Sequence, residues 1–470
     1  MQQDKFTEEC GLIAVWNHKE ASNMAYLGLQ AQQHRGQEGA GLVAIDNSGP
    51  ASFTVHRGLG LVADIFADFD FAKLPGTRAI GHVRYSTAGG HRLANVQPFF
   101  AEVSRGRMAL AHNGNLINAD ALRSSLIESG SIFGSTSDTE VIMHLIARGE
   151  RNVPLVENVI AALQQIQGAY SLLILFEDRV MAVRDPRGFR PLVLGRLNGA
   201  HLIASETCAF DLLGAEFVRE IEAGELLEIS GDGEMRSYRP FPLTQESPCI
   251  FEHVYFARPD SVVFGQSVYQ VRKRLGEELA REHPAKADIV VPVPDSGTTA
   301  ALGFSQASGL PLELGLIRSH YIGRTFIEPK QSIRDFGVKL KLNANAEVLR
   351  GKSIVVVDDS IVRGTTSRKL VALLRRAGAR EVHLRISSPP TTDPCYYGVD
   401  TPQKTELIAA QKSVEEIASY IGVDSLGYLS LEGLHRAVES KPGSMCAACF
   451  SGSYPAGRPQ DCVPKQKKLL

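Results

Sequence analysis

The sequence predicts an α/β and α+β chain of two domains, because two kinds of strand pattern occur in it. Its 470 residues suffice for two or three domains. Ile289–Val293 and Ile354–Val357 are apolar runs, each followed by an acidic residue, a small polar loop and a helix-like segment, as in buried parallel strands. Ser171–Phe176, Val180–Arg184 and Leu202–Ser205 are shorter strands separated by polar turns. We expect the short strands and the parallel sheet to belong to different domains.

Composition and charge are those of an ordinary globular protein. The hydrophobic fraction is 44%, the charged fraction 22% and the net charge -2. Such a charge implies neither a nucleic-acid partner nor a membrane surface. No apolar run reaches 18 residues, and the polar start, residues 1–9, is no signal peptide. Seven cysteines, an odd and sparse set, form no secreted disulfide framework. We therefore expect a cytoplasmic location.

The first predicted strand, Cys10–Trp16, begins with a cysteine that on its own indicates only a buried strand residue. A helix-like segment follows at Ala21–Gln33. Four further blocks then occur in order: Gln33–Gly41, Gly81–Thr87, His112–Asn115 and Ser137–Glu140. The last has the S-x-x-E pattern of a capping box, so it predicts the start of a helix.

These blocks, placed after an early cysteine, resemble the glutamine amidotransferase domain of the N-terminal nucleophile (Ntn) type over residues 10–240. The resemblance implies an Ntn-type αββα sandwich in which Cys10 is the catalytic nucleophile. Residues 1–9 would be a propeptide, because the freed α-amino group of Cys10 acts as the general base. An α-amine titrates near pH 8, so a thiol and its base can share one residue without a histidine.

The other blocks take roles that follow from the shape of glutamine. Arg84 can bind the substrate carboxylate by a two-pronged contact, and Asp138 can bind its ammonium group. In the resembled family, Asn113 and the backbone N–H of Gly114 donate to the tetrahedral oxyanion. Two alternatives stay open. Asp138 can serve as a helix cap alone, and Asn113-Gly114 can form a type I′ turn between strands.

A connector separates the two domains. We expect the second domain at 249–440, and after it a tail at 441–470 that wraps the surface. The connector contains Pro240, Pro242 and Pro248. Val254–Ala257 is strand-like, so a further strand is expected just after the domain boundary.

The run after Ile354–Val357 combines an acidic pair, a small polar loop and a helix start. Asp358 and Asp359 end the strand, and ligands bind at that end of open α/β sheets. The helix start suits a phosphate, whereas the acids suit ribose hydroxyls or Mg²⁺. A solvated acidic turn is the alternative for a lone acidic pair. The whole run closely resembles the phosphoribosyl pyrophosphate (PRPP) signature of type I phosphoribosyltransferases.

That resemblance implies a type I phosphoribosyltransferase α/β domain, in which the two acids contact ribose hydroxyls directly or through Mg²⁺. Ser296 would join Asp358 and Asp359 around Mg²⁺, unless it only forms a serine turn. Arg318–Lys341, with six basic and two acidic residues, would be a lid over pyrophosphate rather than a solvated loop. The residues expected around the 5-phosphate are Ser360, Arg363, Gly364, Thr365 and Thr366.

Four cysteines are candidates for a metal centre. Cys446 and Cys449 form a C-x-x-C pair, while Cys249 and Cys395 lie far away in the sequence. Four thiolates suit Zn²⁺ or an iron–sulfur cluster equally, so the residues alone leave the metal open. The iron–sulfur subgroup of glutamine PRPP amidotransferases has cysteines in these contexts, which implies a 4Fe-4S cluster. Cys462 is a possible substitute ligand.

Nearly the whole chain resembles the glutamine PRPP amidotransferases. The resemblance implies hydrolysis of glutamine and transfer of the ammonia to PRPP, giving 5-phosphoribosylamine, pyrophosphate and glutamate. This is the first committed step of de novo purine (IMP) biosynthesis. A homo-tetramer inhibited by purine nucleotides is also implied. Two alternatives remain: an Ntn hydrolase of another amide with a regulatory second domain, and a PRPP-sensing regulator without catalysis.

Overall fold

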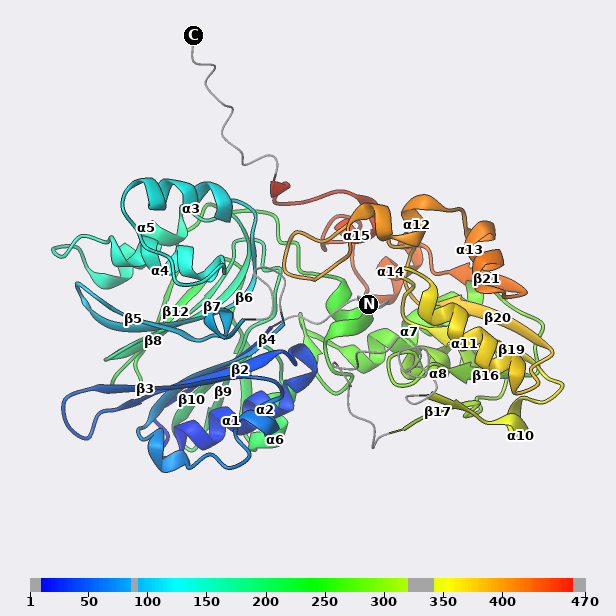
Figure 1. The fold of residues 1–470 in the computed structure, drawn as a ribbon, viewed down its shortest axis with the longest axis horizontal. Helices are drawn as coiled ribbons and strands as arrows, with labels where there is room; N and C mark the ends of the chain where they lie inside the picture. The colour runs from blue at the N-terminus through cyan, green and yellow to red at the C-terminus, as the bar shows by residue number, and fades with distance from the viewer. Residues whose placement is uncertain (1–9, 86–91, 320–341, 460–470) are drawn as a thin grey trace, which may run out of the picture.

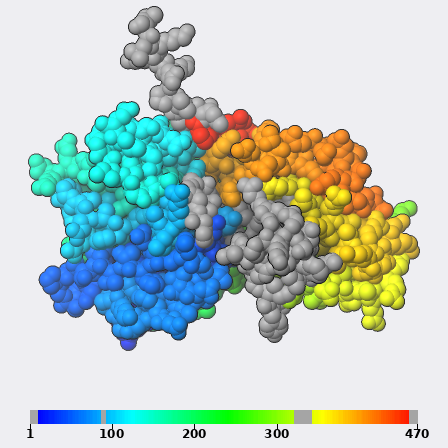
Figure 2. All heavy atoms as spheres, in the orientation of Figure 1, coloured from blue at the N-terminus to red at the C-terminus, as the bar shows by residue number. Residues whose placement is uncertain are grey.

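The computed structural model describes residues 10–85, 92–319 and 342–459, which form two lobes (Figure 1). The lobe drawn on the left contains two antiparallel sheets, and the lobe on the right contains a parallel sheet. The last described residues, coloured red, lie where the two lobes meet (Figures 1 and 2). The predicted lid at Arg318–Lys341 falls mostly outside the described residues, as do residues 1–9, Ser86, Thr87 and Cys462.

The first lobe is a sandwich of a seven-stranded sheet, in the order β11-β9-β10-β1-β4-β2-β3, and a six-stranded sheet, in the order β13-β12-β8-β7-β6-β5. The strands of the first sheet are β1 (Gly11–Trp16), β2 (Gly39–Asp46), β3 (Ser52–Leu59), β4 (Arg78–Arg84), β9 (Val193–Leu197), β10 (Ala200–Ala204) and β11 (Glu216–Glu220). Those of the second are β5 (Phe99–Val103), β6 (Gly106–Leu116), β7 (Gly168–Phe176), β8 (Arg179–Arg184), β12 (Leu226–Ser230) and β13 (Met235–Tyr238).

Both faces of the central strand β1 are apolar because it is buried between a sheet and a helix. Leu12 and Trp16 pack with Ala109 of β6 in the core between the two sheets. Ile13 and Val15, on the other face, pack in the core beneath α1. The outer helices are α1 (Ala21–Ala31), α2 (Val62–Ile65) and α6 (Cys208–Leu213) on one sheet, and α3 (Ala119–Glu128), α4 (Thr139–Ala147) and α5 (Leu155–Leu163) on the other. The predicted αββα sandwich is confirmed.

The second lobe has a parallel sheet in the order β16-β19-β20-β21, as the apolar runs predicted. Helices cover both faces, with separate cores on the two sides. The strands are β16 (Ile289–Pro292), β19 (Ser353–Asp358), β20 (Glu381–Ile386) and β21 (Ser425–Tyr428). The helices are α7 (Val268–Glu282), α8 (Thr298–Ser308), α10 (Ala346–Leu349), α11 (Thr365–Arg376), α12 (Ile408–Gln411), α13 (Val414–Ile421), α14 (Leu431–Ala437) and α15 (Ala448–Ser451). Two small pairs complete the lobe, β14 (Val262–Val263) with β15 (Gln266–Ser267), and β17 (Leu316–Arg318) with β18 (Leu342–Ala344).

Three local expectations were wrong. The predicted strand Val254–Ala257 lies in a π-helical turn, Glu252–Phe256, closed by a bond from Ala257 N to the Glu252 carbonyl (3.1 Å). Burial of its side chains outweighs the strand propensity of valine and aromatic residues. The Ser137–Glu140 capping box does not form, since the Glu140 carboxylate accepts instead from the N–H of Ser135 (2.7 Å). The C-terminal tail was predicted to lie on the surface, but part of it is in the interior, since residues 445–448 are buried.

Candidate active sites and cysteine pocket

Cys10 lies at the entrance to β1, next to Arg84 of β4. Gly11 pairs with Val83 in the antiparallel ladder, so Cys10 and Arg84 are the next opposing residues. Cys10 is 9% exposed, and its sulfur lies 3.6 Å from the carbonyl oxygen of Tyr85. Burial raises the pKa of Cys10 to about 11, although Arg84 and Arg35 favour the thiolate. The thiol is therefore protonated at neutral pH and needs a base before it can act as a nucleophile.

Asn113 and Gly114 lie within the long strand β6, so the alternative of a turn at this point is wrong. Asn113 is 1% exposed, and neither atom of its amide has a hydrogen-bond partner within the part of the chain that the structure describes. Leaving such a group unpaired costs about 1–3 kcal/mol, so it needs a functional or structural reason. The predicted oxyanion supplies one, because it would accept from the amide nitrogen.

Gly114 has a backbone conformation that only glycine fits. Its φ is +142°, and a Cβ there would lie 2.1 Å from the carbonyl oxygen of Ala169. Nearby, the His112 carbonyl lies 3.1 Å from Nε2 of His82 on β4, the strand that carries Arg84. The two sheets thus bring the predicted oxyanion donors to the same end of the sandwich as the predicted carboxylate-binding residue.

Asp138 faces the end of β6 and does not cap α4. Its Oδ2 accepts from the backbone N–H of Leu116 (2.9 Å), and its Oδ1 lies 3.8 Å from Nδ1 of His112. No side-chain capping bond forms at the start of α4, so capping alone does not explain this residue. Its negative charge raises the pKa of the Cys10 thiol, whereas the positive charge of Arg84 lowers it, so the thiol is near enough to feel both charges. A glutamine molecule, with one charge of each sign, matches this pair.

Arg35 is a site residue that the sequence analysis missed. Its Nε donates to the carbonyl oxygen of Cys10 (3.1 Å), and its NH1 and NH2 donate to the Glu252 carboxylate (3.0 and 2.8 Å). Glu206 of the first lobe also binds it, at 2.5 Å, and all three side chains are buried. Only the position of Arg35 in the glycine-rich block Gln33–Gly41 could have signalled a role. Nothing in the sequence pairs it with Glu252, which lies beyond the connector.

The acidic pair lies at the carboxyl end of β19, as predicted. Asp358 and Asp359 are 3% and 1% exposed. Ser296, from the loop after β16, donates to Oδ1 of Asp359 (2.5 Å), and Ser360 donates to its Oδ2 (2.7 Å). Parallel pairing of β16 with β19 brings the two loops together, although 63 positions separate Ser296 from Asp359.

The loop from Ser360 to Thr366 leads into α11. Gly364 precedes the helix with φ of +77°, and Thr365 and Thr366 form its first turn. Backbone N–H groups of a first helical turn face outward and suit a phosphate. Arg363 instead contacts Glu406 through NH2 (3.0 Å). Its predicted contact with the phosphate would therefore compete with this ion pair.

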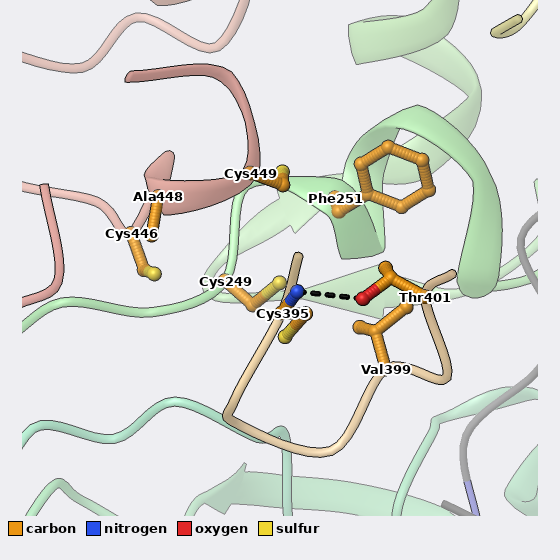
Figure 3. Close-up of a pocket in the computed structure, with 8 residues that line it drawn as sticks. All are labelled: Cys249, Phe251, Cys395, Val399, Thr401, Cys446, Ala448 and Cys449. Atoms are coloured by element: carbon orange, nitrogen blue, oxygen red, sulfur yellow. Dashed lines mark hydrogen bonds between the residues drawn. The ribbon is translucent and has the colours of Figure 1, made fainter. Parts of the chain in front are cut away.

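Four unpaired cysteines line one pocket where the C-terminal segment meets the connector (Figure 3). The Cys249 and Cys446 segments are joined by bonds from Ile250 N to the Cys446 carbonyl (3.1 Å) and from Cys446 N to the Pro248 carbonyl (2.8 Å). The pocket is lined by Cys249, Cys395, Cys446 and Cys449, with Phe251, Val399, Thr401 and Ala448. The fold thus brings together all four predicted ligands.

The four cysteines of the pocket lie in apolar surroundings. Among the residues that the structure describes, no group of three or more His, Cys, Asp or Glu side chains is placed to hold one ion. Burial raises the pKa of Cys249 to about 11, and it raises those of Cys446 and Cys449 further. The backbone N–H of Tyr397 donates to the sulfur of Cys395 (3.3 Å). These thiols surround an apolar space and need a bound positive charge to ionise.

Comparisons with known proteins agree with both halves of the structure. Residues 82–211 match the glutamine amidotransferase domain, and residues 262–414 match the phosphoribosyl transferase domain. The fold and the sites therefore define a glutamine amidotransferase joined to a phosphoribosyltransferase.

Relatives that align with nearly the whole chain identify the family. The amidophosphoribosyltransferase of Bacillus subtilis is 49% identical over 97% of this chain and 96% of its own. Chloroplastic amidophosphoribosyltransferase 1 of Arabidopsis thaliana is 54% identical over 96% of this chain and 79% of its own. A solved B. subtilis glutamine PRPP amidotransferase, complexed with ADP and GMP, has a TM-score of 0.90 and 48% identity, covering 97% and 99% of the two chains. The chain belongs to the amidophosphoribosyltransferase family and carries out glutamine-dependent PRPP amidotransfer in purine biosynthesis.

In the described part of the chain, every helix is too short or too polar to cross a bilayer.

The predicted family and activity are confirmed, whereas the roles of individual residues stay predictions.

Proposed function

We propose that the two lobes divide the reaction between them, with glutamine cleaved in residues 10–240 and PRPP bound in residues 249–440. In the first site, the Cys10 sulfur attacks the amide carbon of glutamine as its proton passes to the α-amine of the same residue. The C–N bond then breaks, ammonia leaves with that proton, and water hydrolyses the resulting thioester to glutamate and the free thiol. Arg84 binds the substrate carboxylate and Asp138 its ammonium. Asn113 and Gly114 donate to the oxyanion. The buried, unpaired amide of Asn113 is the observation that best supports this arrangement.

The proposed base requires removal of residues 1–9, because in the full chain the nitrogen of Cys10 belongs to a peptide bond. We expect a chain that retains residues 1–9 to release glutamate at least 100-fold more slowly than the processed chain. The processed chain should gain activity as the pH rises to about 8, since the free amine acts only when neutral, and then level off. Mass spectrometry of the N-terminus, combined with glutamate release from pH 6 to 10, checks both results. Full activity in the unprocessed chain would contradict the mechanism.

In the second site, Asp358 and Asp359 bind the ribose hydroxyls of PRPP, directly or through Mg²⁺ held with Ser296. The loop Ser360–Thr366 binds the 5-phosphate. Ammonia from the first site attacks C1 of PRPP, the bond from C1 to the pyrophosphate oxygen breaks, and the new ammonium group loses a proton. Mg²⁺ would offset the charge of the departing pyrophosphate. The hydrogen bond between Ser296 and Asp359 supports this grouping.

We also propose that the cysteine pocket holds a 4Fe-4S cluster. Four thiols line one pocket, which matches the four thiolate ligands of a 4Fe-4S cluster. Cys449→Ser should reduce bound iron and acid-labile sulfide to less than about a quarter of wild type, as measured on anaerobically purified protein. Cys208→Ser is the matched control, because Cys208 is buried in α6 outside the pocket. Zinc in place of iron, or full iron in Cys449→Ser, would contradict the assignment.

Regulation and location complete the proposal. A solved relative was complexed with ADP and GMP, which supports feedback by purine nucleotides. A homo-tetramer remains the expected assembly. The six described cysteines are free thiols, as is usual in the reducing cytoplasm, although the plant relatives are named as chloroplastic. Glutamine and PRPP would be the small-molecule substrates.

A further inference from the structure

Three consecutive residues of the second lobe contact the first lobe at the predicted oxyanion donors: two of them contact β6, the strand that carries the donors, and the one between them contacts Arg190. The carbonyl of Tyr396 accepts from the side-chain amide of Asn115 (3.1 Å). The carbonyl of Tyr397 accepts from Nε of Arg190 (2.9 Å). Gly398 packs directly on Gly114. We call residues 396–398 the oxyanion brace.

The contact between Gly398 and Gly114 is backbone against backbone. Gly398 has φ of +110°, and a Cβ there would lie 2.9 Å from the Cα of Gly114 and 3.3 Å from the NH2 of Arg190. A Cβ at Gly114 would in turn collide with Ala169. Because neither residue has a side chain that could give way, a shift of one backbone displaces the other.

The first lobe holds its side of this contact firmly. Arg190 is fully buried, and its carbonyl accepts from Ser171 (3.2 Å) and from Nε of Arg184 (2.8 Å). Ser171 pairs with Asn113 between β6 and β7. The ring of Tyr397 stacks on Phe189, with 4.4 Å between the ring centroids. Arg190 thus links the two segments: its guanidinium binds the brace, and its carbonyl binds Ser171, the residue paired with Asn113.

We infer that residues 396–398 position the oxyanion donors, so that glutamine hydrolysis in the first lobe depends on a loop of the second. Gly398 is a positioning residue, since it acts through Gly114. Cys395, which lines the cysteine pocket, directly precedes the brace, so the two features share one loop. The inference rests on the proposed roles of Asn113 and Gly114, and it adds that these donors need the second lobe for their alignment.

Gly398→Ala tests the brace. We expect kcat for glutamate release to fall about 10- to 100-fold, because the added methyl displaces a donor that must be aligned with the oxyanion. KM for glutamine should stay within about twofold, since Arg84 and Asp138 are untouched. Pyrophosphate release from PRPP with ammonia should also stay within about twofold. Alkylation of Cys10 by iodoacetamide should keep its wild-type rate, because that displacement develops no oxyanion.

Two further variants separate the possible outcomes. Gly130→Ala is the matched control, because Gly130 also has positive φ (+91°) but open space around its Cβ position, and it should match wild type. Asn115→Ala removes the bond to Tyr396 without a clash and should lower kcat for glutamate release severalfold. This variant tests the role of the brace if Gly398→Ala is insoluble. Wild-type kcat in the soluble brace variants, or an equal loss of ammonia-dependent activity, overturns the inference. A wild-type enzyme that releases no glutamate would instead overturn the proposed function itself.

Discussion

Replacing Cys10 with alanine should abolish glutamine-dependent synthesis and leave ammonia-dependent synthesis within about twofold of wild type. Removing the nucleophile from a covalent mechanism costs roughly 10⁴- to 10⁶-fold in rate. The second site lies in the other lobe and receives ammonia whatever its source, so external ammonia should bypass the variant. Glutamate and pyrophosphate release are measured separately at saturating PRPP, at alkaline pH where more ammonia is neutral.

The control for this variant is Cys208→Ala, which also removes a buried thiol of the first lobe but lies in α6, where its sulfur is 3.8 Å from the Ala31 carbonyl. It should retain both activities. If Cys10→Ala lost both activities although it remained folded, the second site would not work independently of the first, and the proposed division between the lobes would be wrong.

Replacing both Asp358 and Asp359 with asparagine should lower pyrophosphate release at least about 10³-fold with either nitrogen donor. Asparagine keeps the shape of the side chain but removes the two charges that would face Mg²⁺ and the ribose hydroxyls. A 10³-fold loss corresponds to about 4 kcal/mol of transition-state stabilisation, which is reasonable for a metal site of two carboxylates. Because glutamine is cleaved in the other lobe, glutamate release without PRPP should remain at its wild-type rate.

Asp288→Asn is the matched control for the acidic pair. Asp288 lies at the opposite, amino end of the same sheet, where its carboxylate accepts from the backbone N–H of Ser353 (2.8 Å). The control should keep wild-type pyrophosphate release. Unchanged release in the Asp358/Asp359 variant would mean that the PRPP signature serves binding or regulation, not catalysis. Isothermal titration with PRPP and Mg²⁺ shows whether binding is lost together with turnover.

Patterns that are local in the sequence predicted local structure well. The apolar runs at Ile289–Val293 and Ile354–Val357 form adjacent parallel strands. A continuous apolar run has hydrophobic side chains on both faces of the strand, so both faces must be buried. The S-x-x-E pattern at Ser413–Glu416 predicts a capped helix that ends at Gly422; the capping box forms, and Gly422 follows the helix with φ of +85°. Where local signals conflicted with burial, as at Glu252–Phe256, the prediction failed.

The sequence by itself determined the buried parallel strands, the early thiol, the acidic pair and the resemblance to the family, because each is encoded within a few neighbouring residues. Only the tertiary structure placed Glu252 on Arg35 and Gly398 on Gly114, whereas the resemblance had already grouped the four cysteines that line one pocket. Such contacts join segments that lie up to hundreds of positions apart. Their geometry depends on how two separately formed cores pack together, and no short stretch of sequence records that arrangement.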